Sequence, residues 1–186
     1  MKEAVEKQLD ELIETAGRFR ALSPLIAQAG LEIKQALCNG KKLLTAGNGG
    51  SAADALHLAE ELVGRFDKER PSLPALALCA DPTLLTCIGN DYGYDRLFSR
   101  QIEGLGQPGD VFVIFTTSGN SNNLVLGLQA AKAKGLKTIA VLGKSGGKAK
   151  GLADIEIIVP SSTTARIQEL HTFVLHNWLS IIEADL

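Results

Sequence analysis

The sequence predicts an α/β fold in which a parallel sheet is covered by helices on both faces. Short apolar runs alternate with segments of helical spacing, which is the order that builds parallel sheets. The clearest strand, VFVIF at residues 111–115, is apolar at every position, as in a strand buried on both faces. The chain of 186 residues contains no linker, low-complexity tract or convincing repeat, so we expect a single domain over residues 1–186.

Two helices are expected before the first strand. Apolar residues follow helical spacing over residues 5–19, and Ser23, which precedes a proline, is the predicted N-cap of a second helix that stops at Gly40. A doubly wound sheet does not need such a pair. Residues 1–40 therefore pack either on the core or on a partner subunit, and the frequency of symmetric homo-oligomers favours the partner.

Strands and helices then alternate to the end of the chain. The predicted strands are residues 43–46, 75–79, 111–115, 138–142 and 155–159. Helices are predicted from Ser51, from Asp81 as a cap to about residue 88, and then over residues 97–105, 124–135 and 165–183. Residues 89–93 are rich in polar side chains and glycine and are predicted to form a turn.

Charge and aromatic content argue against a nucleic-acid partner. The formal net charge is -2, which does not suit broad contact with a phosphate backbone. Aromatic residues make up 5% of the chain and leave few platforms on which bases could stack. A small-molecule ligand is therefore the more plausible partner.

Cysteine content and the N-terminus indicate the compartment. Cys38, Cys79 and Cys87 are odd in number and contain no C-x-x-C, so they are interpreted as reduced core thiols rather than a disulfide framework or a cysteine zinc site. The first 17 residues are charged throughout and lack the apolar centre of a secretory signal, and no run approaches the roughly 18 apolar residues of a membrane span. A cytoplasmic protein without a membrane partner is expected.

Residues 42–65 combine the features of a ligand site. An apolar strand leads into the glycine turn 47–50, and a helix starts at Ser51. Glycines permit positive φ and close approach of the backbone to a ligand, and the helix start offers N–H groups to oxygen-rich ligands. His57 and Glu61 lie four residues apart, so they share one face of that helix.

Two nucleotide-binding motifs are matched only in part. Residues 47–52 fit G-x-G-x-x-A, but Asp67 lies in a connection and Asp81 comes too late to be the expected acidic ribose partner. So short a chain would also lack the catalytic domain of an NAD-linked enzyme. Residues 143–145 resemble the end of a P-loop, yet the required glycine five residues earlier is Thr138.

A second polar turn follows the strand at residues 111–115. Four hydroxyl side chains surround a glycine at the start of a helix, so a phosphate could receive hydroxyl and backbone N–H hydrogen bonds there. They are Thr116, Thr117, Ser118 and Ser121. This turn is the better candidate for a phosphate, which leaves the turn 47–50 as the reacting end of the site.

A divalent ion could be held between two helices. Gln168 and His176 on the last helix, together with His57 and Glu61, supply two imidazoles, a carboxylate and a carboxamide, a set that suits zinc best. Gln168 and His176 lie about 12 Å apart along a helix axis. They reach one ion only by leaning together or by coming from different subunits.

These motifs resemble the sugar isomerase (SIS) family, and among its members the phosphoheptose isomerases. The segments that carry the resemblance are AGNGGSAADALHLAEEL, GRF...RPSLPA, IGNDYG, TTSGNS, GGK and RIQELH...H, in the family's order. The resemblance implies a three-layer, flavodoxin-like SIS fold with a five-stranded parallel sheet. It also implies a homotetramer with sites at subunit interfaces, and interconversion of sedoheptulose 7-phosphate with D-glycero-D-manno-heptose 7-phosphate for bacterial surface glycans.

The family motifs assign roles to particular residues. The implied metal ligands are His57, Glu61, Gln168 and His176. The implied substrate contacts are Asn48, Gly49, Gly50, Glu61, Asn90, Asp91, Thr116, Thr117, Ser118, Ser121 and Gln168. Two positions depart from the pattern: Thr116 replaces an expected serine and keeps the hydroxyl, and residues 161–165 lack an acidic residue that some members carry.

The chemistry implied by the family agrees with these residues. Ketose–aldose isomerisation passes through an enediolate and needs a base, an acid and stabilisation of developing charge on oxygen. Glu61 is the candidate base and His176 its acid/base partner. The alternative is a SIS adaptor that binds the bacterial replication initiator protein, but such a module is expected to lose the histidine and glutamate set that is present here.

Overall fold

The computed structural model describes residues 1–184, and within them the expected three-layer α/β/α fold is confirmed. The five parallel strands lie in the order β2-β1-β3-β4-β5. They are β1 (Leu43–Gly47), β2 (Ala75–Ala77), β3 (Val111–Thr116), β4 (Lys137–Gly143) and β5 (Ile155–Val159). Apart from β2, each predicted strand agrees with the structure to within one residue at either end.

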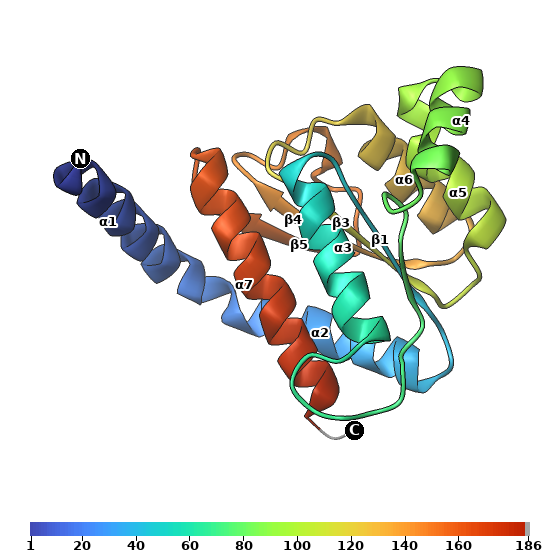
Figure 1. Ribbon diagram of the computed structural model, residues 1–186, viewed down its shortest axis with the longest axis horizontal. Helices are drawn as coiled ribbons and strands as arrows, with labels where there is room; N and C mark the ends of the chain where they lie inside the picture. Colours follow the sequence, from blue (N-terminus) through green and yellow to red (C-terminus); the bar gives the residue numbers. More distant parts are fainter. Residues whose placement is uncertain (185–186) are drawn as a thin grey trace.

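Helices cover both faces of the sheet (Figure 1). They are α1 (Lys2–Phe19), α2 (Ser23–Cys38), α3 (Gly50–Val63), α4 (Pro82–Tyr92), α5 (Leu97–Leu105), α6 (Asn122–Ala133) and α7 (Thr164–Glu183). Short 3-10 turns lie at Arg20–Leu22, Tyr94–Arg96 and Gly147–Ala149. One apolar cluster joins the sheet to α2, α3 and α7, and a second joins it to α4, α5 and α6.

The central position of β3 in the sheet explains why residues 111–115 are all apolar. Val111, Val113 and Phe115 belong to the cluster under α2, α3 and α7, whereas Phe112 and Ile114 belong to the cluster under α4, α5 and α6. Successive side chains of a strand point to opposite faces, so in a central strand covered on both sides every position is buried and apolar residues are favoured throughout.

The two N-terminal helices have different environments. Helix α2 packs into the core through Ile26 and Ile33, whereas α1 extends away from the rest of the molecule (Figure 1). On α1 the side chains of Val5, Leu9 and Ile13 are 68%, 54% and 61% exposed. The core therefore accounts for the second helix, and the apolar stripe of the first faces solvent in a single chain.

Three of the predicted boundaries that were wrong have a clear local cause. Strand β2 ends at Ala77, because the chain then turns and the Ala80 N–H donates to the Ala77 carbonyl. Helix α4 continues to Tyr92 through the predicted turn 89–93, and its stop is Gly93, which has a positive φ of 82°. Ser23 is the first residue of α2 rather than its cap, and its hydroxyl donates to the Arg20 carbonyl.

The structure also tests the predicted helix cap at Asp81 and the predicted burial of the cysteines. Asp81 is confirmed as the cap of α4, since its carboxylate accepts hydrogen bonds from the N–H groups of Thr83 and Leu84. The three cysteines are free, as expected. The prediction of core thiols is wrong for Cys38 and Cys87, which are exposed, whereas Cys79 is half-buried and packs against both apolar clusters. Cys38 and Cys87 lie on the outer sides of amphipathic helices, which a residue count alone does not distinguish from the inner sides.

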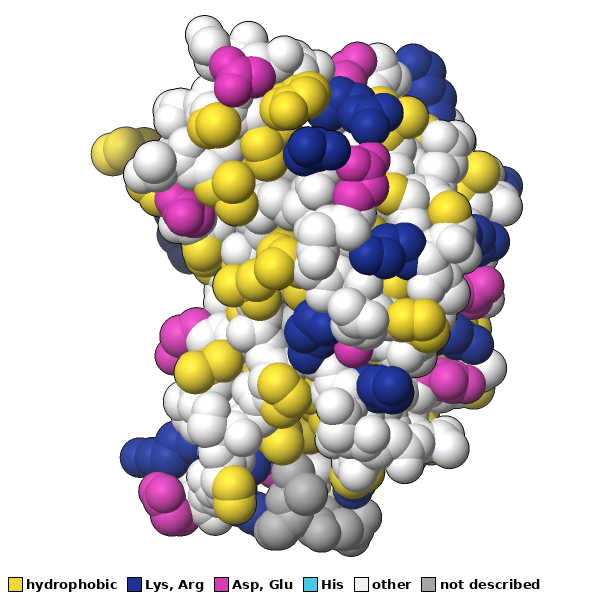
Figure 2. Space-filling view, turned by 90° about the vertical axis from the view of Figure 1, so that its right-hand side faces the viewer, with side chains coloured by type: hydrophobic (Ala, Val, Ile, Leu, Met, Phe, Trp, Pro, Cys, Tyr) yellow, Lys and Arg dark blue, Asp and Glu magenta, His cyan; other side chains and the backbone are white. Residues whose placement is uncertain are grey.

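The outer surface on the side of α4, α5 and α6 is chemically mixed. Figure 2 shows basic and acidic side chains interspersed with apolar ones and no visible histidine. The histidines lie on α3 and α7, which cover the opposite face of the sheet. Among residues 1–184, no helix is both long enough and apolar enough to cross a membrane.

Candidate active site

The two polar turns lie side by side at one edge of the sheet. Strands β1 and β3 are neighbours in register, with Gly47 opposite Phe115, so the turns that follow them leave the sheet at the same level. The chain goes from β1 outward to β2 and then returns to β3 on the other side of β1. Ligands of open α/β sheets bind at such a switch point.

The turn after β1 is organised around Asn48. The Asn48 side-chain oxygen accepts hydrogen bonds from Tyr94 (2.8 Å) and from the amide of Asn123 (2.9 Å), and its own amide donates to Asn123 (3.0 Å). The orientation of both amides follows from the backbone N–H of Leu124, which donates to the Asn123 oxygen. The side-chain oxygen of Asn48 is therefore fully used, whereas the second hydrogen of its amide group can still donate to a ligand oxygen.

Two glycines of this turn lie close to other parts of the chain, and at Gly47 glycine is required. A side chain at Gly47 would collide with the backbone of Ser51, and one at Gly50 would collide with the carboxamide of Gln168. Gln168 from α7 thus rests on the first turn of α3.

The hydroxyl-rich turn after β3 uses some of its groups internally. The hydroxyls of Thr116 and Ser118 accept hydrogen bonds from the N–H groups of Gly119 and Asn120, at 3.1 and 3.2 Å. Ser121 is the N-cap of α6 but makes no side-chain cap hydrogen bond, so its hydroxyl is left for a ligand at the positive end of that helix. The turn can therefore offer hydroxyl and N–H donors to an anion.

His57, Glu61 and His176 come together where α3 meets α7. The His57 Nε2 atom lies 3.2 Å from a Glu61 carboxylate oxygen, and the rings of His57 and His176 meet edge to face at 5.1 Å. Phe66 stacks on the other side of His176, with ring centroids 5.6 Å apart. Burial lowers the pKa of His176, the neighbouring His57 lowers it further, and Glu61 opposes both effects.

The fourth predicted ligand lies apart from these three in a single chain. Gln168 lies against Gly50, seven residues before His57 and about 10 Å from it along the axis of α3. The carboxylate of Glu60 is closer: the donor atoms of His57, Glu60 and Glu61 lie within 4.8 Å of one another. The role of Gln168 as a fourth ligand thus stays a prediction. It still requires that the roughly 12 Å between Gln168 and His176 along α7 be bridged, or that the two residues come from different subunits.

Two other predicted site residues are remote from this cluster. Asn90 and Asp91 lie in the last turn of α4, where the Asn90 amide donates to Asp91 (2.7 Å) and the Cys87 thiol contacts the other Asp91 oxygen (3.7 Å). Both residues are exposed. Their predicted contact with substrate therefore stays a prediction.

Comparisons with known proteins place the chain in a family. Residues 5–143 match the family model described as the SIS domain. The phosphoheptose isomerase of a Nitratiruptor species is 50% identical, with 98% of each chain covered. Solved structures of phosphoheptose isomerases from Francisella tularensis and Neisseria gonorrhoeae are 36% and 39% identical, with TM-scores of 0.95 and 0.91 and 98% of each chain covered.

The chain belongs to the phosphoheptose isomerase family. The adaptor alternative is not supported, because these full-length relatives are isomerases. The side chains that an adaptor is expected to lose are not only present but gathered, with His57 in contact with both Glu61 and His176.

Sequence reasoning missed a buried carboxylate next to the histidine pair. Asp54 lies one helical turn before His57, and one of its oxygens accepts a hydrogen bond from the Thr172 hydroxyl (2.9 Å). Its other oxygen is buried with no hydrogen-bond partner among the described residues. Burial raises the pKa of Asp54 to about 6, against the lowering effects of the Thr172 hydrogen bond and His57. The spacing of Asp54 to Glu61, two turns of one helix, was the available signal.

A cation beside the hydroxyl-rich turn was also missed. The Lys148 ammonium group donates to the side chain of Asn122 (3.1 Å) and its backbone N–H donates to the side chain of Asn120 (3.2 Å). This member of the phosphoheptose isomerase family therefore brings one positive charge to the predicted phosphate turn. Lys148 belongs to the GGK segment noted in the sequence, but no role was assigned to it there, because it lies 26 residues from Asn122.

Proposed function

We propose that the protein interconverts sedoheptulose 7-phosphate and D-glycero-D-manno-heptose 7-phosphate, as an aldose–ketose isomerase of bacterial heptose biosynthesis. The observation that carries the proposal is the group of His57, Glu61 and His176 at the α3–α7 contact, in a fold that also presents two polar turns at the sheet edge. The relatives named above, which match over the full chain, support this choice among sugar isomerase activities.

The two turns divide the substrate between them. The phosphate lies at residues 116–121, where the free Ser121 hydroxyl, the start of α6 and nearby Lys148 favour an anion. The open-chain sugar extends toward Asn48, whose remaining N–H donates to a substrate oxygen, and its carbonyl end lies beside Glu61. Contacts from Gly49, Gly50, Gln168, Asn90 and Asp91 belong to the same proposal.

Proton transfer falls to Glu61 and His176. Glu61 removes the proton from C1 of the ketose and, once protonated, delivers it to C2, while His176 moves the proton of the C1 hydroxyl to the C2 oxygen as the enediolate forms and collapses. The lowered pKa of His176 keeps its imidazole neutral at neutral pH, in the form that can accept a proton. Phe66 and the edge of His57 hold that ring between them.

A zinc ion is the proposed cofactor. Imidazole nitrogens and a carboxylate oxygen of His57, Glu61 and His176 are donors that zinc prefers, and Gln168 is the proposed fourth ligand. When bound, zinc polarises substrate oxygens and stabilises negative charge on them. A carboxylate bound tightly to a metal is a poorer base, so Glu61 serves in both roles only if its coordination loosens when substrate binds.

The proposed assembly is a homotetramer with sites at subunit interfaces, in the cytoplasm. The exposed apolar stripe of α1, with Val5, Leu9 and Ile13, supports burial against another copy of the chain. Light scattering coupled to gel filtration checks this: a tetramer mass is expected, and a monomer at assay concentrations would contradict the interface sites.

A coupled assay tests the activity and the cofactor together. Purified protein is expected to convert sedoheptulose 7-phosphate to the aldose, to lose that activity after treatment with a chelator, and to regain it with added zinc. Absence of turnover with zinc present would rule out the isomerase. Full turnover after exhaustive chelation would keep the isomerase and remove the zinc.

A further inference from the structure

Helix α3 ends without the glycine cap that usually closes a helix. Its C-cap residue, Gly64, has a negative φ of -79°, so it does not adopt the left-handed conformation of the common C-terminal motifs. The last carbonyl groups of a helix need partners from elsewhere. Glu61 lies in this last turn, so the closure of the helix end determines how firmly its side chain is placed.

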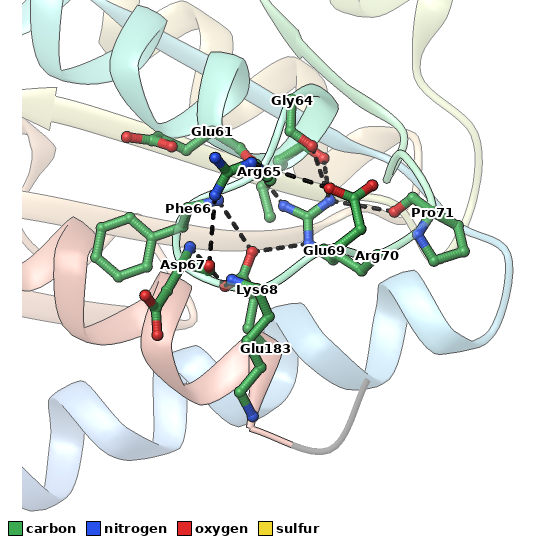
Figure 3. Close-up of polar contacts among 11 residues, drawn as sticks. Glu61, Gly64, Arg65, Phe66, Asp67, Lys68, Glu69, Arg70, Pro71 and Glu183 are labelled. Carbon is green, nitrogen blue, oxygen red and sulfur yellow. Dashed lines mark hydrogen bonds and ion pairs between the residues drawn. The ribbon is translucent and has the colours of Figure 1, made fainter.

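Arg70 supplies those partners (Figure 3). Its guanidinium donates to the carbonyls of Glu61 (2.6 Å), Leu62 (2.9 Å) and Gly64 (3.3 Å). The planar guanidinium has five N–H donors spread over three nitrogens, so it can satisfy several carbonyls at once. A lysine ammonium has a single nitrogen and cannot reach all of these carbonyls from one position. Arg70 therefore acts as the cap of α3.

Glu183, at the end of α7, holds both Arg70 and the loop before it. One oxygen accepts hydrogen bonds from Arg70 Nε (2.9 Å) and the Phe66 N–H (3.0 Å). The other accepts from the N–H groups of Asp67 (2.9 Å) and Lys68 (3.0 Å). The side chains of Arg70 and Glu183 are only 1% and 3% exposed. Loop 66–68 is thus fixed to α7 by a buried carboxylate.

The ion pair of Arg70 and Glu183 connects the segment that carries Glu61 with the segment that contacts His176. On one side it closes the helix turn that carries Glu61, and on the other it sets the loop from which Phe66 stacks on His176. His176 and Glu183 lie two turns apart on α7. The path from Glu61 through Arg70, Glu183 and α7 to His176 is closed by direct contacts.

We propose that Arg70 and Glu183 form a positioning pair that fixes Glu61 and His176 relative to each other, through the last turn of α3 and the Phe66 loop. The roles of Glu61 and His176 are those of the proposed function. A buried ion pair is a weak source of stability, because desolvation offsets its attraction and apolar replacements are often tolerated. Its hydrogen bonds here are directed at backbone groups next to the reacting side chains, which is the work of a positioning residue.

Arg70→Lys and Glu183→Gln test the positioning pair, and Leu128→Ala is the matched control. Arg70→Lys keeps the positive charge but removes the several N–H donors of the guanidinium. Glu183→Gln removes the negative charge and keeps one of the two acceptor oxygens. Leu128 is fully buried on α6, across the sheet from His57, Glu61 and His176, so its truncation costs stability through a cavity. Each protein is assayed well below its unfolding temperature for kcat and KM, and its metal-free form is titrated with zinc by calorimetry.

Both variants of the positioning pair are expected to lose about tenfold to a hundredfold in kcat and in zinc affinity, with a smaller change in KM. Leu128→Ala is expected to lose stability alone. Variants of the pair that lose stability like the control, yet keep kcat and zinc affinity, would overturn the proposal. If the wild-type protein does not turn over sedoheptulose 7-phosphate, the proposed function fails and the zinc titration still decides the positioning pair. If it binds no zinc, kcat decides.

Discussion

Glu61→Gln is expected to lower kcat for sedoheptulose 7-phosphate by about a hundredfold to ten-thousandfold, the usual contribution of a positioned general base. Glutamine has nearly the shape of glutamate, and its side chain can still meet His57, which lies 3.2 Å from the carboxylate. It cannot accept the C1 proton. Because the proposed phosphate site at residues 116–121 is left unchanged, KM is expected to change less than kcat.

Glu60→Gln is the comparison for this experiment. Glu60 precedes Glu61 and is exposed, and its carboxylate reaches the same histidine. A smaller loss of activity is expected for Glu60→Gln, with folding of both variants checked by circular dichroism. A Glu61→Gln enzyme that remains active would rule out Glu61 as the base, and a larger loss for Glu60→Gln would move that role to its neighbour.

Features that depend on neighbours in the sequence could be predicted. The apolar run of β3 and the shared face of His57 and Glu61 follow from the strand and helix periods, so both were predicted and are present in the structure. The prediction failed at residues 89–93, where polar residues and Gly89 indicated a turn. A helix tolerates one internal glycine, and the stop is Gly93, where the backbone needs a positive φ.

Contacts between distant residues could not be predicted in the same way. Asp54 meets Thr172 across 118 residues, Asn48 meets Asn123 across 75, and Arg70 meets Glu183 across 113. Each pair depends on how segments far apart in the chain fold together, and a single sequence carries no local signal for that. The phosphoheptose isomerase resemblance supplied ligands and substrate contacts, but not the polar residues that hold them in place.

Helices α3 and α7 run in the same direction and share a polar seam. In order along both helices, Gly50 meets Gln168, Asp54 meets Thr172, and His57 meets His176. The seam ends where Glu183 binds the loop that follows α3. Spacings of about four residues on both helices keep these contacts in register. A site placed on such a seam is held by two packed helices rather than by loops alone.

His171, beneath this seam, is expected to make stability fall in mild acid. It is fully buried, its Nε2 atom lies 3.1 Å from the Leu142 carbonyl, and its Nδ1 atom has no hydrogen-bond partner among the described residues. Burial lowers the pKa of His171 from 6.5 to about 4, although the Leu142 hydrogen bond opposes this. Between these two values the unfolded chain binds a proton that the folded protein does not. The free energy of unfolding therefore decreases by about 3 kcal/mol as the pH falls through that window.

Asp54 acts in the opposite direction over much of the same window. Its pKa is raised from 3.8 to about 6, so there the folded protein holds a proton that the unfolded chain has lost, and the Asp54 contribution improves as the pH falls. Denaturant unfolding from about pH 4 to about pH 7.5, at one protein concentration, separates the two effects. His171→Gln, which keeps a donor for Leu142, is expected to retain more of its stability in acid than the wild type, and Asp54→Asn to retain less. Parallel curves for the wild type and His171→Gln would mean that His171 is not buried as a neutral imidazole.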